Sequence, residues 1–210
     1  MRKQTTTPIV LTGGPGAGKT AVIEHIAHLG FHCCQEVGRQ VIQSQVEQGG
    51  KAVPWQDKTA FRDRMLSAEQ ANHARVADHK GAVFFDRGLV DIYGYSRLEG
   101  LALPSSLVKA CETQRYHDPV FLFPPWEAIF TNDKERKQSF AEAVATFEIM
   151  QTAYRHFGYT LVEVAQARVH NRAEFSLDRV IRWLFFRADE EPPMRPSFNS
   201  ALPLNQEPMA

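Results

Sequence analysis

The sequence has little cysteine, no excess of charge of either sign and no long hydrophobic run. Its three cysteines, two of them adjacent (Cys33 and Cys34), supply neither a disulfide framework nor a C-x-x-C pair, so we expect reduced thiols in a cytoplasmic protein. Basic and acidic residues number 24 each, which leaves no broad positive surface for nucleic acid. The eight histidines show no spacing typical of a metal site. The apolar run after the polar residues 1–7 is too short for a signal or membrane segment, so no membrane partner is expected.

Apolar residues are plentiful enough for one sizeable core. The chain has 210 residues, of which 43% are hydrophobic, and it carries 14 phenylalanines. Nothing in its middle resembles a linker, so residues 1–187 are predicted to form one domain. Residues 188–210 are polar and contain five prolines, which predicts a flexible tail.

Residues 13–20 match the phosphate-binding pattern G-x-x-x-x-G-K-[ST] at every fixed position. Glycines allow successive backbone N–H groups to turn inward around phosphate oxygens. Lys19 supplies a mobile positive charge for the β- and γ-phosphates, and the Thr20 hydroxyl is a ligand for Mg²⁺. An apolar strand precedes the loop and a helical pattern follows it, which argues against a chance glycine-rich turn. The residues expected to bind a nucleoside triphosphate are Gly13, Gly14, Pro15, Gly16, Ala17, Gly18, Lys19 and Thr20.

Short apolar segments alternate with helical patterns along the chain. Strands are predicted at residues 8–12, 31–36, 81–86, 120–123 and 160–164. Besides the helix that follows the phosphate-binding loop, helices are predicted at about 40–48, 57–77, 138–157 and 173–187. Continuously apolar strands separated by helices indicate the α/β class, with a parallel five-stranded sheet covered by helices on both faces.

Asp86 ends the apolar strand 81–86, at the sheet edge where open α/β sheets bind ligands. We predict that Asp86 holds Mg²⁺ together with Thr20; the alternative is that Asp86 only caps the next helix. A shared metal requires the strands that carry these residues to be neighbours, with strand 120–123 on the other side of strand 8–12.

Arg87 follows this carboxylate directly. Its guanidinium is suited to a phosphate or substrate contact, or to an ion pair with Asp91 or Glu36. The sequence leaves these alternatives open.

Three segments together resemble P-loop kinases: residues 13–20, Glu36 to Arg39, and Phe85 to Gly88. The resemblance covers roughly residues 6–186. It is to the small AAA-like ATPase and kinase group that contains the nicotinamide riboside kinase domain of a bacterial NAD-biosynthesis regulator, and more distantly to thymidylate and deoxynucleoside kinases. It implies sheet order 2-3-1-4-5, ATP with Mg²⁺ as cofactors, and a lid after the fourth strand. Gly88 stands where deoxynucleoside kinases carry serine, which disfavours a nucleoside acceptor.

The resemblance also implies catalytic roles. Glu36 takes the proton from an attacking hydroxyl, and Arg39 is placed with it as a substrate-binding residue. Apart from the resemblance, Lys19 and Asp86 are catalytic candidates from their own motifs, and Arg87 is a candidate for a substrate contact. The alternative for Glu36 and Arg39 is a purely structural place in the first turn of a helix.

The lid is predicted in the polar, mixed-charge stretch 131–137. Within it Arg136 is the first candidate to stabilise developing charge, ahead of Lys134 and Lys137, unless the stretch is only a solvated face. Trp55 and the pair Tyr93 and Tyr95 either line an acceptor pocket or belong to the core.

These observations favour an ATP- and Mg²⁺-dependent phosphotransferase that moves the γ-phosphate to a small metabolite, nucleoside-like or with another hydroxyl acceptor. A hydrolytic ATPase switch and a regulatory nucleotide-binding protein are the alternatives. Guanine specificity is unsupported because Phe123-Pro124-Pro125-Trp126 stands where a GTPase carries an Asn-Lys-x-Asp run.

Overall fold

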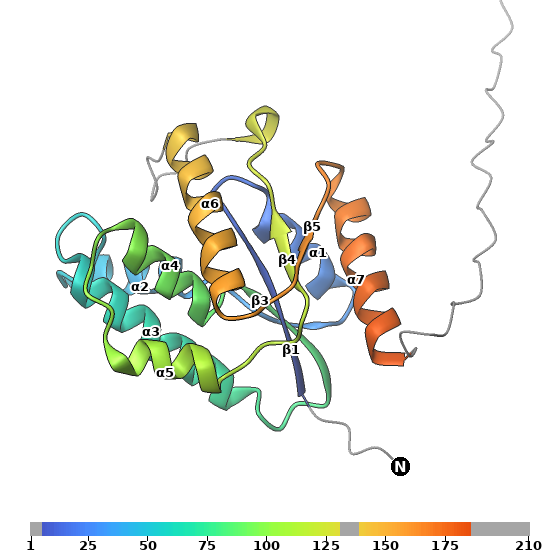
Figure 1. The fold of residues 1–210 in the computed structure, drawn as a ribbon, viewed down its shortest axis with the longest axis horizontal. Helices are drawn as coiled ribbons and strands as arrows, with labels where there is room; N and C mark the ends of the chain where they lie inside the picture. The colour runs from blue at the N-terminus through green and yellow to red at the C-terminus, as the bar shows by residue number, and fades with distance from the viewer. Residues whose placement is uncertain (1–5, 131–138, 186–210) are drawn as a thin grey trace, which may run out of the picture.

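A single parallel sheet forms the centre of the protein. The structure, a computed structural model, describes residues 6–130 and 139–185. Its five strands are hydrogen-bonded in the order β2-β3-β1-β4-β5 (Figure 1). Their bounds are Thr6–Gly13 for β1, His32–Cys34 for β2, Gly81–Asp86 for β3, Val120–Phe123 for β4 and Leu161–Glu163 for β5. The predicted fold class and strand order are therefore confirmed.

Helices follow or precede the strands in the alternation that the sequence predicts. Their bounds are Lys19–His28 (α1), Val37–Glu47 (α2), Lys58–Arg75 (α3), Leu89–Leu98 (α4), Ser105–Thr113 (α5), Phe140–His156 (α6) and Val169–Phe185 (α7), with a short 3-10 helix, η1, at Glu127–Ile129. Two helix starts differ from the prediction by three residues or more: α2 begins at Val37 rather than near 40, and α7 begins at Val169 rather than 173. No residue range was predicted for α4 or α5. Weak helix formers such as Gly38 in the first turn of α2 obscure such starts in a sequence.

The register of the sheet brings two loop-bearing strand ends together. Strand β1 pairs with β3 from Thr6 to Leu11, where Leu11 lies opposite Asp86. On its other side β1 pairs with β4, from Leu11 opposite Phe121 to Gly13 opposite Phe123. The predicted neighbours of strand 8–12 are thus both confirmed. The carboxyl ends of β1 and β3 consequently meet at one edge of the sheet.

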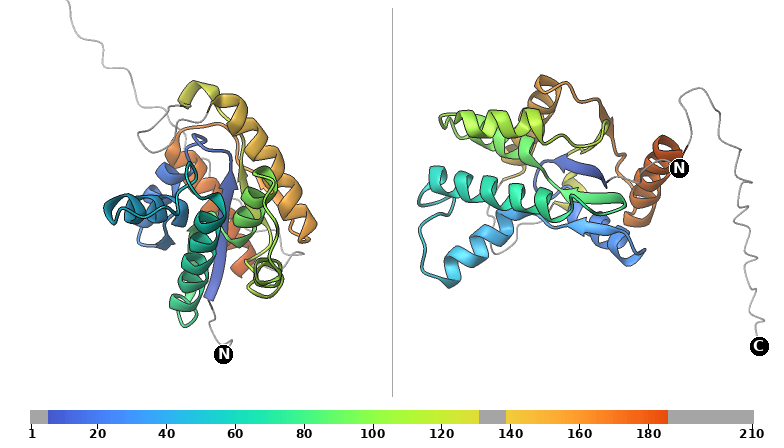
Figure 2. Two further views of the ribbon diagram at one scale, coloured as in Figure 1. Left: turned by 90° about the vertical axis from the view of Figure 1, so that its left-hand side faces the viewer. Right: turned by 90° about the horizontal axis from the view of Figure 1, so that it is seen from below.

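Side chains alternate between two cores, one on each face of the sheet. Ile9 and Leu11 of β1 pack with buried residues of α1 and α7, whereas Val10 packs with α2 to α6. Cys33 and Cys34 of β2 likewise belong to opposite faces of the sheet. Figures 1 and 2 show α3, α4 and α5 gathered on the side of the molecule away from α7.

No helix within residues 6–130 and 139–185 combines the length and hydropathy needed to cross a membrane. The predicted lid segment 131–137 and tail 188–210 lie outside the described residues.

Candidate active site

The turn from β1 into α1 has the backbone conformation that a phosphate-binding loop requires. Helix α1 begins at Lys19, directly after Gly18, whose φ of 78° lies in the left-handed region. A Cβ on Gly18 would also lie only 2.7 Å from Nη1 of Arg172, so a side chain has no room there. Glycine is thus required at the entrance to α1, where the backbone N–H groups and the helix dipole favour an anion.

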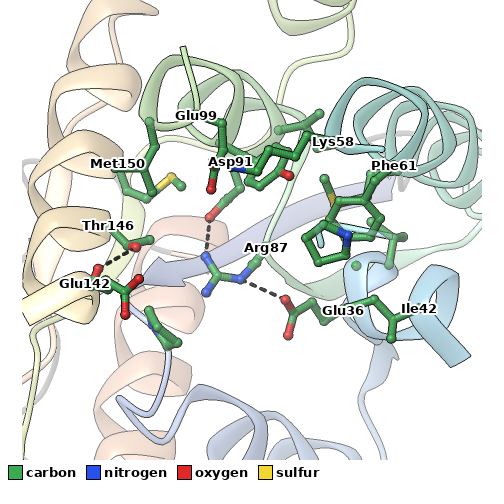
Figure 3. A pocket seen from close by; sticks show the side chains of 18 of the residues that line it. Glu36, Ile42, Lys58, Phe61, Arg87, Asp91, Glu99, Glu142, Thr146 and Met150 are labelled. Carbon is green, nitrogen blue, oxygen red and sulfur yellow. Dashed lines mark hydrogen bonds and ion pairs between the residues drawn. The ribbon is translucent and has the colours of Figure 1, made fainter. Parts of the chain in front are cut away.

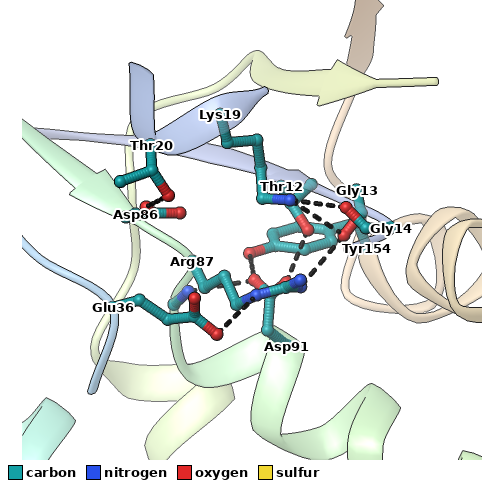
Figure 4. A network of polar contacts seen from close by, with 11 residues as sticks. Thr12, Gly13, Gly14, Lys19, Thr20, Glu36, Asp86, Arg87, Asp91 and Tyr154 are labelled. Atoms are coloured by element: carbon teal, nitrogen blue, oxygen red, sulfur yellow. Dashed lines mark hydrogen bonds and ion pairs between the residues drawn. The ribbon is translucent and has the colours of Figure 1, made fainter. Parts of the chain in front are cut away.

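Lys19 is buried and is held by the loop itself (Figure 4). Its Nζ donates to the carbonyl oxygen of Gly14 at 2.6 Å and to that of Gly13 at 3.4 Å. Burial lowers the pKa of Lys19 to about 7, and Arg87 adds to this effect, while three nearby carboxylates oppose it. A phosphate arriving at the loop would replace carbonyl partners with a full negative charge.

Thr20 and Asp86 lie together as the metal hypothesis expects. The Thr20 hydroxyl donates to Oδ2 of Asp86 at 3.0 Å. Oδ1 of Asp86 is buried and has no hydrogen-bond partner among the described residues. Burial raises the pKa of Asp86, and the Glu36 carboxylate raises it further. An orphaned carboxylate oxygen beside a hydroxyl fits the oxygen donors that Mg²⁺ prefers, with the remaining ligands left to phosphate and water. Asp86 does not cap α4, because the residue before that helix is Gly88.

Arg87 connects Glu36, which precedes α2, with Asp91 of α4 and with the phosphate-binding loop. Its Nε donates to Oε1 of Glu36 at 3.1 Å, and its Nη1 donates to Oδ1 of Asp91 and to the carbonyl oxygen of Gly13, both at 3.0 Å. Although burial alone would lower the pKa of Arg87, the Glu36 and Asp91 carboxylates raise it above its ordinary value. Both ion-pair alternatives for Arg87 are therefore realised at once.

The backbone at Arg87 is strained. Its φ is 71°, and it is the one non-glycine residue with positive φ in the described part of the chain. Such a conformation costs on the order of 1–3 kcal/mol and persists only where the surroundings fix it. Here the backbone N–H of Arg87 donates to the Leu11 carbonyl at 3.0 Å, and the side chain is fixed by its ion pairs. Strain of this kind is concentrated at functional turns.

Asp91, in the first helical turn of α4, stabilises the strained backbone at Arg87 through hydrogen bonds. Its Oδ1 accepts from the Thr12 hydroxyl at 2.6 Å as well as from Arg87, and its Oδ2 accepts from the Tyr154 hydroxyl at 2.6 Å and the Gly88 N–H at 2.9 Å. Four hydrogen-bond donors thus hold this buried carboxylate in place. Figure 4 shows Asp91 beneath Arg87, with Tyr154 beside it.

A second buried chain of hydrogen bonds stabilises the segment that follows Arg87. The Leu89 N–H donates to the Tyr116 hydroxyl at 3.0 Å, which donates in turn to Oε1 of Glu69 at 2.8 Å. A Cβ on Gly88 would lie 2.7 Å from the Tyr116 ring. Tyr116 therefore fits only because position 88 has no side chain.

A pocket of about 390 Å³ opens beside the loop. Pro15 of the phosphate-binding loop, Glu36 and Arg87 are among the residues that line it. Figure 3 shows Arg87 between two walls, with Met150 and Thr146 of α6 on one side and Phe61 and Ile42 on the other. The pocket thus extends from the phosphate-binding loop into the layer formed by α2, α3, α4 and α6.

The other predicted site residues are placed as follows. Arg39 is half-buried in α2 and is not among the residues that line the pocket. Arg136, with Lys134 and Lys137, lies outside the described residues.

The aromatic candidates divide between pocket and core. Trp55 and Tyr95 line the pocket. Tyr93 instead packs in the core against Phe157, with ring centroids 5.0 Å apart.

Sequence reasoning missed Arg172, which reaches the loop from α7. Its Nη2 donates to the Ala17 carbonyl at 2.6 Å, and its guanidinium lies over the rings of Phe123 and Trp126, at 4.6 and 5.7 Å from their centroids. Burial lowers the pKa of Arg172. No local pattern marks this arginine, because 155 residues separate it from its loop partner.

Comparison with known proteins agrees with this geometry. The model of a family described as "AAA domain" matches residues 8–172. No curated protein gives a significant sequence match. Among solved structures, a NadR protein in complex with NR has a TM-score of 0.62 at 16% identity, with 85% of this chain and 51% of that chain covered. The present chain therefore spans about half the length of that NadR chain.

Two smaller enzymes share the fold over nearly their whole length. Shikimate kinase from Acinetobacter baumannii, in complex with shikimate, has a TM-score of 0.55 at 18% identity, covering 87% of this chain and 97% of that one. Deoxyadenosine kinase from M. mycoides has a TM-score of 0.54 at 12% identity, covering 82% and 97%. The protein has the fold of the P-loop kinases, and, with well over half of its residues matched by the family model, it belongs to the AAA domain family.

Proposed function

We propose that the protein is an ATP- and Mg²⁺-dependent phosphotransferase that moves the γ-phosphate to a hydroxyl group of a small metabolite. The pocket beside the phosphate-binding loop carries this proposal. A hydrolytic ATPase needs only a water molecule next to the γ-phosphate, whereas a pocket of about 390 Å³ reaching to Met150 has room for an organic acceptor.

The nucleotide side of the site is assigned to the loop residues. Backbone N–H groups of the loop from Gly13 to Thr20, other than Pro15, which has none, would surround the phosphates, and Lys19 would contact the β- and γ-phosphates. Thr20 and Asp86 would hold Mg²⁺, which neutralises charge on the transferring phosphoryl group.

The acceptor side is assigned to Glu36 and Arg87. The acceptor oxygen forms a bond to the γ-phosphorus while the bond from that phosphorus to the β–γ bridging oxygen breaks, leaving ADP. The hydroxyl proton passes to the Glu36 carboxylate, which Arg87 holds in place at 3.1 Å. Arg136 from the lid and Arg39 from α2 remain candidates for contacts to the transferring phosphate and the acceptor.

The test begins with a screen for metabolites that raise the melting temperature of the protein in the presence of a non-hydrolysable ATP analogue. ADP release from ATP is then measured with and without the metabolites found in this way. Glu36→Gln is expected to leave ATP·Mg²⁺ affinity nearly unchanged and to slow acceptor-dependent ADP release by roughly 10²–10⁴-fold. Glu47→Gln, an exposed glutamate at the end of α2, the helix that Glu36 directly precedes, is the matched control. ADP release that no metabolite accelerates would instead indicate the hydrolytic ATPase.

A further inference from the structure

Apolar side chains line much of the pocket, among them Phe61 and Met65 of α3, Ile92 of α4 and Met150 of α6. Figure 3 shows Phe61 and Met150 on opposite sides of it. The rings of Phe61 and Tyr95 meet edge to face, with centroids 5.6 Å apart. Whatever occupies this part of the pocket gains free energy by burying apolar surface.

The charged groups of the pocket are unsuited to an anion. Among its described lining residues, four are acidic (Glu36, Asp91, Glu99 and Glu142) and two are basic (Lys58 and Arg87). Lys58 is already ion-paired with Glu99, and Arg87 with both Glu36 and Asp91. A carboxylate or phosphate on the acceptor would have to displace one of these pairs or lie next to an excess of negative charge.

The pocket also lacks the side-chain amides that pair with a nucleobase edge: no asparagine or glutamine is among the lining residues in the described part of the chain. The uncharged polar side chains are Trp55, whose indole N–H can only donate, Thr146, whose hydroxyl donates to the Glu142 carbonyl at 2.7 Å, and Tyr95, whose buried hydroxyl has no described partner. A nucleobase with several hydrogen-bond donors and acceptors would lose its hydrogen bonds to water in this pocket and would replace few of them with hydrogen bonds to the protein.

We propose, on the basis of the phosphotransferase function above, that the acceptor is a small alcohol with an apolar body and no negative charge. Its hydroxyl lies at Glu36 and Arg87, and its ring or short chain fills the space lined by Phe61, Met65, Ile92 and Met150. The Tyr95 hydroxyl offers one polar contact within this space. Nucleosides and carboxylate-bearing alcohols are the classes that this pocket disfavours.

The experiment compares three chemical classes as acceptors for ATP·Mg²⁺. The alcohols are benzyl alcohol, 2-phenylethanol and 3-phenyl-1-propanol, which differ by one CH₂ each; adenosine and thymidine represent nucleosides, and shikimate represents anionic alcohols. We expect kcat/KM for ADP release to rise about fourfold per added CH₂, equivalent to about 0.8 kcal/mol, and to exceed the values for the other two classes.

A substitution at the mouth of the pocket tests where the alcohols bind. Trp55 is 57% exposed and lines the pocket, so Trp55→Ala removes apolar surface without opening the core. It is expected to lower kcat/KM for 3-phenyl-1-propanol at least threefold. Phe175→Ala, an exposed aromatic on α7 that does not line the pocket, is the control and is expected to change nothing.

The outcomes separate this proposal from the function on which it rests. Phosphorylation of adenosine, thymidine or shikimate in preference to the alcohols would overturn the acceptor class and leave the phosphotransferase standing. If nothing accelerates ADP release, binding of the alcohols to the protein loaded with AMP-PNP and Mg²⁺ is measured by calorimetry. Binding that tightens with chain length would support the apolar site and contradict phosphotransfer to these alcohols; absence of binding would overturn the proposed acceptor class.

Discussion

Glu69 provides a sharp test of the buried network behind the Arg87 turn. The side chain is 2% exposed, and its carboxylate accepts from the Tyr116 hydroxyl and, at 3.4 Å, from Asn72. Burial raises the pKa of Glu69 to about 7; the two hydrogen bonds and Arg75 oppose this shift, and Asp91 adds to it. The folded protein therefore binds the Glu69 proton more tightly than the unfolded chain does.

The sign and size of the effect follow from linkage. Because the folded-state pKa lies above the unfolded value of 4.5, the stabilisation is complete below pH 4.5 and is lost as the pH rises through about 7. Between pH 5.5 and pH 8, this group alone should lower the free energy of unfolding by about 2 kcal/mol. Glu69→Gln cannot ionise, yet its amide oxygen still accepts from Tyr116, so the variant should not show this loss.

The assay is urea denaturation of the wild type and of Glu69→Gln at several pH values in this range. As the pH rises, the free energy of unfolding of Glu69→Gln relative to that of the wild type is expected to increase by about 2 kcal/mol. His73, whose pKa burial lowers to about 4, titrates in both proteins and cancels in the difference. Glu47→Gln, exposed on α2, controls for the loss of one negative charge. A difference that stays constant within about 0.5 kcal/mol would refute this account of the network.

Substitutions on the nucleotide side have separate expected outcomes. Lys19→Ala should weaken ATP·Mg²⁺ binding by about 10- to 100-fold in a folded protein, since a buried charged donor is lost; unchanged affinity by calorimetry would contradict this. Asp86→Asn should reduce the dependence of nucleotide affinity on Mg²⁺ concentration, and an unaltered dependence would remove Asp86 from the metal site. Arg172→Lys keeps the charge but loses the planar group that reaches Ala17, so the Kd for ATP should rise about tenfold; an unchanged Kd would leave Arg172 a purely structural role.

Local patterns predicted the sheet and the phosphate-binding loop well. Strand β3 is continuous in apolar residues up to Asp86, and the glycines of residues 13–20 mark a turn that few other residues could make. The position of strand 120–123 followed from one chemical requirement, that Asp86 and Thr20 reach the same place. Such features are encoded by residues close together in the chain, or by strand ends that a parallel sheet must align.

The walls of the pocket could not be predicted in the same way. Met150, Phe61 and Ile92 look like ordinary core residues in their helices, because periodicity shows only that one helix face is apolar. Whether such a face closes against another helix or leaves a cavity depends on how α3, α4 and α6 pack. Arg172 was missed for the same reason, since its role exists only through contact between α7 and the loop.

The two sides of the candidate site form one electrostatic unit. Arg87 bonds to Glu36 on the acceptor side and to the Gly13 carbonyl, which also accepts from Lys19 on the nucleotide side. Glu36 raises the pKa of both Lys19 and Asp86, so its charge acts on the residues assigned to phosphate and metal. A proton delivered to Glu36 would remove that negative charge and alter the electrostatic environment of Lys19 and Asp86. In the proposed phosphotransferase, proton transfer at the acceptor and charge at the nucleotide would therefore be coupled through the shared contacts of Arg87.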